Sequence, residues 1–368
     1  MRPFLFASLL FIAMSSHADT LVYFGSYAQG EGAGIYVARF DSRAGRLSPP
    51  TIAAPMAQPG FLVFDAKGSH LYAVGERAEG IVRGFSIDRA DGRLSPLGRA
   101  TSGGPGPCHI SMHPDGVHLF ASNYSDGSVG VVRIHSDGSL AATDRAAYFG
   151  SSVHPQRQTK SYAHSATPSS NGRFLVVADL GADRLVIHRF DPQSGTLTES
   201  DPPFARVAPG SGPRHFAFHP DGRRAYVVNE LSNTVTVFDW DADLGTLGER
   251  QTISTLPSDY AQPSTSAEVA VHPSGRFLYT SNRGHDSIAV FAIDGTNGTL
   301  EARGHRSVLG QTPRHFALSP DGRWMIVANQ GSNQVRTFSV DTNDGDLEPH
   351  GEPFTVPVPT CVRFLRLD

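Results

Sequence analysis

Cysteine is scarce in this chain, since only Cys108 and Cys361 occur among its 368 residues and at most one disulfide can form. The two thiols can pair in an oxidising compartment, or they can remain as small buried side chains. A basic stripe or arginine-rich run is also missing, and the formal net charge is −4, with 31 basic and 35 acidic residues. We therefore expect no nucleic-acid partner.

Several sequence patterns of enzymes and cofactor sites are absent as well. No stretch after residue 20 shows the period of an amphipathic helix, so no phosphate-binding loop opens a helix. No Gly-x-Ser-x-Gly segment presents a serine nucleophile, and no spacing of histidine, cysteine and aspartate suggests a zinc site. We expect an all-β protein that uses no metal and no cofactor.

Residues 1–18 differ from the rest of the chain. Arg2 gives a positive start, "FLFASLLFIAM" is an apolar core, and "SHA" places small residues before Asp19. The apolar run is too short to span a bilayer comfortably. We predict a secretory signal peptide over residues 1–18, cleaved after Ala18, in preference to an uncleaved anchor. A single domain, residues 19–368, would then lie in the periplasm or outside the cell, without stable membrane insertion.

Two short phrases repeat through the chain in step. The first is glycine, any residue, leucine, and its seven glycines are Gly45, Gly92, Gly138, Gly195, Gly245, Gly298 and Gly345. The second ends an apolar run in Pro-Asp-Gly or a similar turn, at Gly68, Gly116, Gly172, Gly222, Gly275 and Gly322. Such turns between alternating apolar runs are typical of β-hairpins. Each period therefore predicts four strands, the content of one β-propeller blade.

The repeat count closes at seven. The first unit lacks an innermost strand, whereas "PTCVRFL" at residues 359–365 is an innermost strand with nothing after it. We predict a seven-bladed β-propeller of four-stranded blades, closed by pairing residues 359–365 with the strand that contains residues 21–27. Closure of this kind removes the exposed edges of an open sheet.

The register of the repeat gathers polar residues from successive blades on one face of the disk. Seven or eight residues before the turn glycine, where the innermost strand opens, stand His109, His164, Arg214, His215, Glu268, Arg314 and His315. Seven or eight residues after it, where the next strand returns, stand Asn123, Asp179, Asn229, Glu230, Asn282, Arg283 and Asn329. Such a ring around a concavity indicates a site for an anionic small molecule. The alternative is a polar plug that neutralises itself and seals the channel.

Two further groups of residues are placed by the same register. Residues 143–162 form a long linker that enters the strand of His164, so we expect Arg157, Gln158 and Lys160 near the charged mouth, in contact with a ligand or as a solvated loop. The histidines of the "HPDG" and "HPSG" turns lie on the opposite face, where we expect them to cap turns: His113, His219 and His272.

With these segments in view, the chain resembles the seven-bladed propeller lactonases, a family with bacterial 6-phosphogluconolactonase of the cycloisomerase type and fungal carboxymuconate lactonizing enzyme. The resemblance rests on strings such as "RQTKSYAHSA", "GPRHFAFHPDGRRAYVVNEL" and "SNRGHDSIAVF" and covers nearly the whole mature chain. It implies a catalytic set of His164, Arg214, Glu230 and Arg283. The chain has Tyr162 where the family usually has a second histidine, and its leader argues against the cytosolic substrate 6-phosphogluconolactone.

The resemblance implies hydrolysis of a sugar-derived or carboxylated lactone. Opening the ester needs an activated water, stabilisation of the oxyanion and a proton for the leaving alkoxide. Either His164 or Glu230 can be the base, with the other as acid, while Arg214 and Arg283 bind the oxyanion or an anionic substituent. Two alternatives are a lyase or cycloisomerase of the muconate type and a non-catalytic propeller that binds a ligand or partner. We expect a monomer whose partner is a small, anionic lactone.

Overall fold

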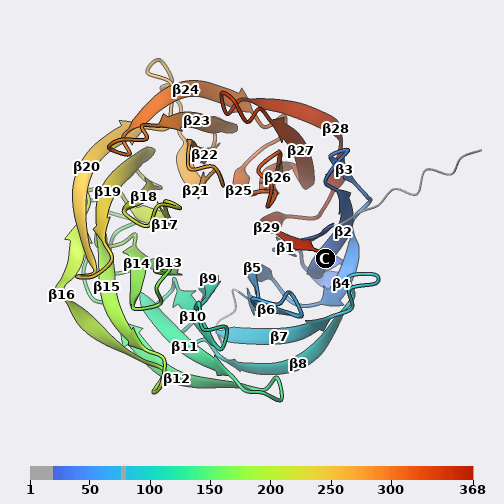
Figure 1. The fold of residues 1–368 in the computed structure, drawn as a ribbon, viewed down its shortest axis with the longest axis horizontal. Helices are drawn as coiled ribbons and strands as arrows, with labels where there is room; N and C mark the ends of the chain where they lie inside the picture. The colour runs from blue at the N-terminus through green and yellow to red at the C-terminus, as the bar shows by residue number, and fades with distance from the viewer. Residues whose placement is uncertain (1–19, 76–79, 368) are drawn as a thin grey trace, which may run out of the picture.

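The computed structural model describes residues 20–75 and 80–367, and the predicted signal peptide lies outside them. Seven antiparallel sheets surround a central channel like the blades of a propeller (Figure 1). The predicted fold is therefore confirmed. The described residues contain two single-turn 3₁₀ helices, η1 (Gly30–Gly32) and η2 (Gln330–Ser332). No helix in this part of the chain has the length and apolar character needed to cross a membrane.

The strands follow the predicted period. Blade 1 consists of β29 (Pro359–Arg366), β1 (Thr20–Ser26), β2 (Gly34–Asp41), β3 (Arg46–Leu47) and β4 (Thr51–Pro55). Blades 2 and 3 consist of β5 (Pro59–Phe64), β6 (His70–Gly75), β7 (Ile81–Ile87) and β8 (Leu94–Thr101), then β9 (Pro107–Met112), β10 (His118–Asn123), β11 (Ser128–Ile134) and β12 (Leu140–Ala147). Blades 4 and 5 consist of β13 (Ala163–Pro168), β14 (Phe174–Asp179), β15 (Arg184–Asp191) and β16 (Thr196–Arg206), then β17 (Pro213–Phe218), β18 (Arg224–Asn229), β19 (Thr234–Asp241) and β20 (Thr246–Ser254). Blades 6 and 7 consist of β21 (Thr265–Val271), β22 (Phe277–Arg283), β23 (Ser287–Ile293) and β24 (Leu300–Ser307), then β25 (Pro313–Leu318), β26 (Trp324–Asn329), β27 (Gln334–Val340) and β28 (Leu347–Thr355).

The two ends of the described chain meet in blade 1. Strand β29 pairs with β1 in antiparallel register, with Thr20 opposite Arg366 and Phe24 opposite Val362. The C-terminal strand therefore supplies the innermost strand that the first unit lacks, as predicted. This pairing completes blade 1 and closes the ring.

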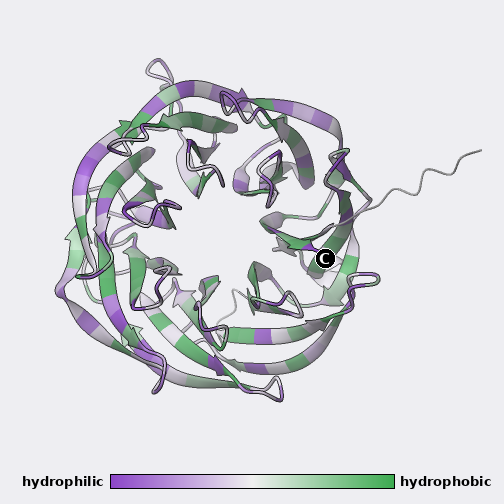
Figure 2. Ribbon diagram, in the orientation of Figure 1, coloured by the Kyte–Doolittle hydropathy of each residue, from purple (hydrophilic) through white to green (hydrophobic). Residues whose placement is uncertain are grey.

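The hydrophobic core lies between neighbouring blades. Phe174 of blade 4, for example, packs edge-on against Trp240 of blade 5, with ring centroids 5.7 Å apart. Hydrophobic residues follow the middle strands, whereas outer strands such as β20 and β24 carry many hydrophilic residues (Figure 2). A blade whose two faces are both covered by neighbours needs apolar residues on both, which explains the continuous apolar runs of strands such as β14.

The turn histidines join one blade to the next. His113 lies 2.8 Å from the carbonyl oxygen of Gly172, the turn glycine of the following blade. His219 and Gly275, and His272 and Gly322, repeat this contact at 2.9 and 3.0 Å. The prediction that these histidines cap turns on the face opposite the site is consistent with these contacts.

Candidate active site

A β-bulge occurs at the same place in the innermost strand of every blade. In β17, Pro213 lies opposite Asn229 and His215 lies opposite Val228, so Arg214 is an extra residue. The same shift of register recurs in the other six blades. Because a bulge inserts one residue and re-aims the side chains beside it, each innermost strand has two successive residues at this level. We call them the upper layer (Gly60, Cys108, His164, Arg214, Ala267, Arg314 and Thr360) and the lower layer (Phe61, His109, Ser165, His215, Glu268, His315 and Cys361).

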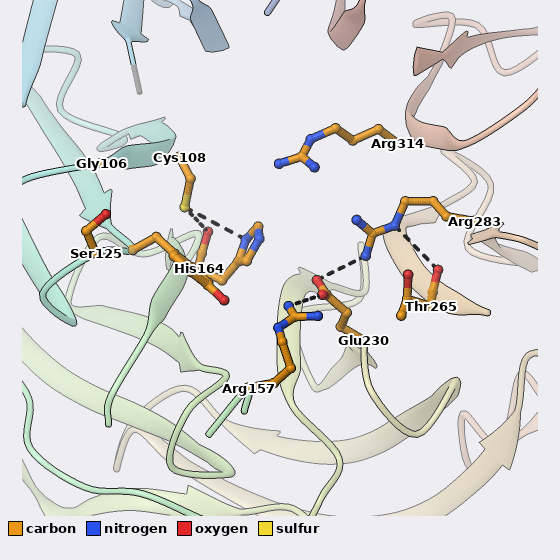
Figure 3. Close-up of a pocket in the computed structure, with 10 residues that line it drawn as sticks. Gly106, Cys108, Ser125, Arg157, His164, Glu230, Thr265, Arg283 and Arg314 are labelled. Atoms are coloured by element: carbon orange, nitrogen blue, oxygen red, sulfur yellow. Dashed lines mark hydrogen bonds and ion pairs between the residues drawn. The ribbon is translucent and has the colours of Figure 1, made fainter. Parts of the chain in front are cut away.

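Three residues of the upper layer, Cys108, His164 and Arg314, border a cavity of about 330 Å³ (Figure 3). Its lining residues are Gly106, Cys108, Tyr124, Ser125, Arg157, His164, Glu230, Thr265, Arg283 and Arg314. The structure thus brings together three of the four residues predicted to be catalytic, since His164, Glu230 and Arg283 face one space. Arg214, the fourth, is only 2% exposed and contacts Glu230 from behind the cavity wall. The catalytic roles of these residues stay a prediction.

Glu230 is the acceptor for three guanidinium groups. Its Oε2 lies 3.0 Å from Nε of Arg214 and 3.1 Å from Nη2 of Arg283. Its Oε1 lies 2.5 Å from Nη2 of Arg157. Burial alone would raise the pKa of this carboxyl, but Arg283, Arg214 and Arg157 together lower it to about 2. Glu230 therefore remains an anion at any physiological pH and fixes the orientation of the arginines around it.

His164 stands across the cavity from Glu230 (Figure 3). Burial holds the pKa of its imidazole well below 6.5, and the charges of Arg214, Arg314 and Arg283 lower it further. At neutral pH the ring is therefore uncharged and has a lone pair to accept a proton. Sγ of Cys108 lies 3.9 Å from its Nδ1. Cys108 and Cys361, both described residues, form no disulfide, which settles the alternative left open by the sequence.

The lower layer seals the channel beneath the cavity. Glu268 Oε2 lies 2.8 Å from Nδ1 of His215 and 3.2 Å from Nε2 of His315, while the ring of Phe61 packs against His109 with centroids 4.5 Å apart. These four polar residues were predicted to bind substrate, but they do not line the upper cavity. A second cavity of about 260 Å³ lies on their other side, toward the turns. Here the geometry corresponds to the polar plug that the sequence offered as an alternative.

The polar residues that end the second strands do not reach the cavity either. They are fully buried within the blades: Asn123, Asp179, Asn229, Asn282 and Asn329. Asp179 pairs with Arg184 at 3.1 Å, and Oδ1 of Asn282 accepts a hydrogen bond from Thr255 at 2.8 Å. Side chains alternate along a strand, so the next residue along, such as Glu230, faces the cavity instead. Nothing in their geometry supports the predicted contact with substrate.

The long linker does reach the mouth of the cavity, through Arg157 but not through Gln158. The side chain of Gln158 is almost fully buried, and its Nε2 donates to the carbonyl of Leu180 at 2.9 Å. Lys160 donates to the carbonyl of Ser125 at 2.6 Å and does not line the cavity. Gln158 and Lys160 therefore anchor the linker, and Arg157 alone of the three faces the site.

Two side chains of the cavity were not predicted, although both stand at positions in the register of the repeat. Cys108 occupies the position in blade 3 that His164 occupies in blade 4, and Tyr124 occupies the position of Glu230. Both line the cavity. Their chemistry did not single them out, because a thiol and a phenol at these positions are also ordinary core residues. Thr265 and Ser125, in contrast, lie outside the register and carry no sequence signal.

One group of side chains in the described residues has the composition of a metal site, although none was predicted. His113, Asp115 and His118 lie within 4.8 Å of one another. The carboxylate of Asp115 lies between the two rings, 3.0 and 2.7 Å from their Nδ1 atoms. The same turn in blade 5 pairs Asp221 with His219 and with Arg224, so a guanidinium replaces the second ring. This equivalence favours a carboxylate–cation turn cap over a metal centre.

This protein is a seven-bladed propeller with a polar cavity at one mouth of its channel, which defines its class as a propeller with a small-molecule site. Residues 21–364 match the model of the family described as "Lactonase, 7-bladed beta-propeller". The chain belongs to this family. The predicted lactonase, a hydrolase that opens the ester of a lactone, is thereby confirmed as the class of enzyme, and neither alternative is favoured.

Individual relatives agree with the family. The chain is 36% identical to 6-phosphogluconolactonase of Bacillus subtilis over 297 residues, which is 80% of this chain and 83% of the relative. A structure described as a periplasmic gluconolactonase of Pseudomonas aeruginosa is 34% identical, with a TM-score of 0.90 over 95% of this chain and 99% of that one. A putative 6-phosphogluconolactonase of Bacteroides fragilis is 33% identical, with a TM-score of 0.89 and the same coverage.

Proposed function

We propose that the protein hydrolyses an anionic, sugar-derived lactone in the upper cavity, with His164 as general base. The observation that carries this proposal is the charge of the cavity. Three guanidinium groups line it, those of Arg157, Arg283 and Arg314, while Glu230 is the one carboxylate among the lining residues. A surplus of fixed positive charge in a partly buried site favours an anionic substrate. Relatives named 6-phosphogluconolactonase support a phosphorylated lactone as one candidate.

The choice of base follows from the two environments. Both carboxylate oxygens of Glu230 are engaged by guanidinium groups, and its pKa of about 2 makes it a weak base. His164 lines the same cavity and is uncharged at neutral pH, because burial and nearby arginines lower its pKa, so its lone pair can accept a proton. We therefore assign proton transfer to His164 and assign to Glu230 the orientation of Arg214 and Arg283.

The reaction then has one proton cycle. His164 accepts a proton from a water molecule as the water oxygen bonds to the lactone carbonyl carbon. The guanidinium of Arg283, which faces the cavity, stabilises the negative charge that develops on the carbonyl oxygen. The bond to the ring oxygen breaks, and His164 returns its proton to that oxygen. The product is the open hydroxy acid, which ionises in water.

The site of action would be the periplasm or the exterior of the cell. The predicted signal peptide over residues 1–18 supports this location, and so does the similarity to a structure described as a periplasmic gluconolactonase. A periplasmic enzyme meets substrates that the cell has not taken up, so the physiological lactone can differ from that of cytosolic relatives.

An acid-release assay over a panel of charged and neutral lactones tests the proposal. We expect hydrolysis of at least one anionic sugar lactone, and His164→Asn should lower kcat by about 10²–10⁴ while KM changes little. Thermal unfolding of the variant should be measured in parallel, because a loss of folding would mimic a loss of catalysis. Absence of turnover on every lactone, or full activity of the variant, would overturn the proposal.

A further inference from the structure

Arg157 differs from the other arginines of the cavity in the element that carries it. Arg283 ends β22 and Arg314 belongs to β25, so both are fixed by the propeller. Arg157 belongs to the linker between β12 and β13 and reaches the cavity from outside. Its side chain is 38% exposed, compared with 14% for Arg283 and 2% for Arg214. Arg157 is thus the more exposed of the two cavity arginines that pair with Glu230.

The linker holds Arg157 at the mouth from both sides. Before it, the backbone of His154 donates to Oε1 of the buried Gln158 at 3.0 Å. After it, the ring of Tyr162 stacks on Tyr124 of blade 3 with centroids 4.7 Å apart, and Lys160 binds the carbonyl of Ser125. Such anchors fix the segment without fixing the guanidinium itself, whose position depends on Glu230 and on the hydroxyl of Tyr124.

The ion pair of Arg157 with Glu230 can break without leaving a buried charge unpaired. Removing one partner of a buried ion pair is strongly destabilising when the other charge is left alone. Here Glu230 would keep Arg214 and Arg283 on Oε2 after Arg157 leaves Oε1. An arriving phosphate or carboxylate offers the guanidinium an alternative anionic partner, one that can accept two hydrogen bonds from it. Exchange of Glu230 for the substrate anion is therefore possible without a change in the rest of the site.

We propose that Arg157 is the residue that distinguishes an anionic from a neutral lactone, by exchanging its ion pair with Glu230 for one with the anionic group of the substrate. This inference rests on the proposed function and adds to it the residue that recognises the negative charge of the substrate. Arg214 and Arg283 remain with Glu230, and Arg283, which lines the cavity, serves the reacting carbonyl. The specificity of the enzyme therefore resides in the linker, and the chemistry resides in the propeller.

The test compares two lactones that differ only in a phosphate, 6-phosphoglucono-δ-lactone and glucono-δ-lactone. The measured quantity is the ratio of their kcat/KM values. We expect Arg157→Gln to reduce this ratio about 10–100-fold, the value of one lost charge-assisted contact, mainly through a higher KM for the phosphorylated substrate. Arg145→Gln is the matched control, because Arg145 is similarly exposed and pairs with Asp126 at 2.8 Å, outside the cavity. It should leave the ratio unchanged.

The outcomes separate this inference from the proposed function. If the wild-type protein opens neither lactone nor any other, the proposed function fails and the inference fails with it. If the wild type is active and Arg157→Gln keeps the wild-type ratio, the inference alone is wrong. An equal fall of the ratio in Arg157→Gln and Arg145→Gln would also overturn it, because net charge and not a specific contact would then set the preference.

Discussion

The carboxylate of Glu230 and the guanidinium of Arg214 meet at 3.0 Å, and both side chains are almost completely buried at the rim of the channel. Two arginines that face the cavity share the same carboxylate. A single buried anion therefore holds three cations together, and its first role is structural. Loss of activity in a Glu230 variant would not by itself prove a role in proton transfer.

Glu230→Gln should lower the free energy of unfolding by about 3–5 kcal/mol, because it removes the partner of buried cations while keeping the shape of the side chain. Thermal or urea unfolding measures this change. Inorganic phosphate should restore more stability to the variant than to the wild type, since an anion can occupy the place of the lost carboxylate. A variant as stable as the wild type would contradict the structural role of Glu230.

The fold could be predicted from the sequence because its signals are local and repeated. Each turn glycine fixes the register of its own blade, and seven copies of the glycine–leucine phrase indicate seven blades. The residues that line the cavity could be predicted only in part. Whether His164 or its neighbour faces the mouth depends on the β-bulge, which adds one residue without changing the apolar pattern. The alternation of strands was enough to find Glu230 but not to exclude Asn229 beside it.

Other parts of the site depend on contacts between distant segments. Arg157 reaches Glu230 across 73 positions of sequence, from a linker without periodicity. The residue beside it, Gln158, has similar chemistry in the sequence but lies buried against Leu180. Only the folded path of the linker distinguishes the two, so no pattern in the sequence could separate a ligand contact from an anchor.

Stability should fall as the pH falls below about 6.5. Burial, with nearby arginines or histidines, lowers the pKa of four channel histidines well below that value: His109, His164, His215 and His315. In the unfolded chain each binds a proton near pH 6.5, whereas in the folded protein it stays neutral, so protonation favours unfolding. Each group contributes up to about 1.4 kcal/mol per pH unit in this range. Urea midpoints measured from pH 8 to pH 5 test the effect.

A second loss of stability is expected as the pH falls from about 4.5, the unfolded pKa of Glu230, toward its folded pKa of about 2. This group stabilises the fold while it is ionised, so its contribution is complete above its unfolded pKa. His109→Asn should reduce the number of protons taken up on unfolding between pH 8 and pH 5 by about one. A midpoint that is constant between pH 8 and pH 5 would contradict the assignment of neutral histidines.

If the protein is exported, signal cleavage determines the first residue of the mature chain. The small residues of "SHA" precede Asp19, so cleavage after Ala18 should leave Asp19 as the first residue. Chemical sequencing or mass spectrometry of the protein from a periplasmic fraction measures this directly. Recovery of the chain from the cytosol with Met1 intact would refute both the location and the case against a cytosolic substrate.

Gly172 and Gly222 form a matched pair for testing the contact between blades. Their φ angles are almost the same, +70° and +69°, so alanine at either position incurs the same backbone strain, about 1–2 kcal/mol. A Cβ at Gly222 would meet nothing within 4 Å, whereas a Cβ at Gly172 would lie 2.7 Å from Nε2 of His113. Gly172→Ala should therefore destabilise the protein by a further 1–3 kcal/mol or so, because it displaces a buried ring from its hydrogen-bond partner. Urea unfolding of the two variants measures the difference, and equal losses would show that His113 does not hold blade 3 against blade 4.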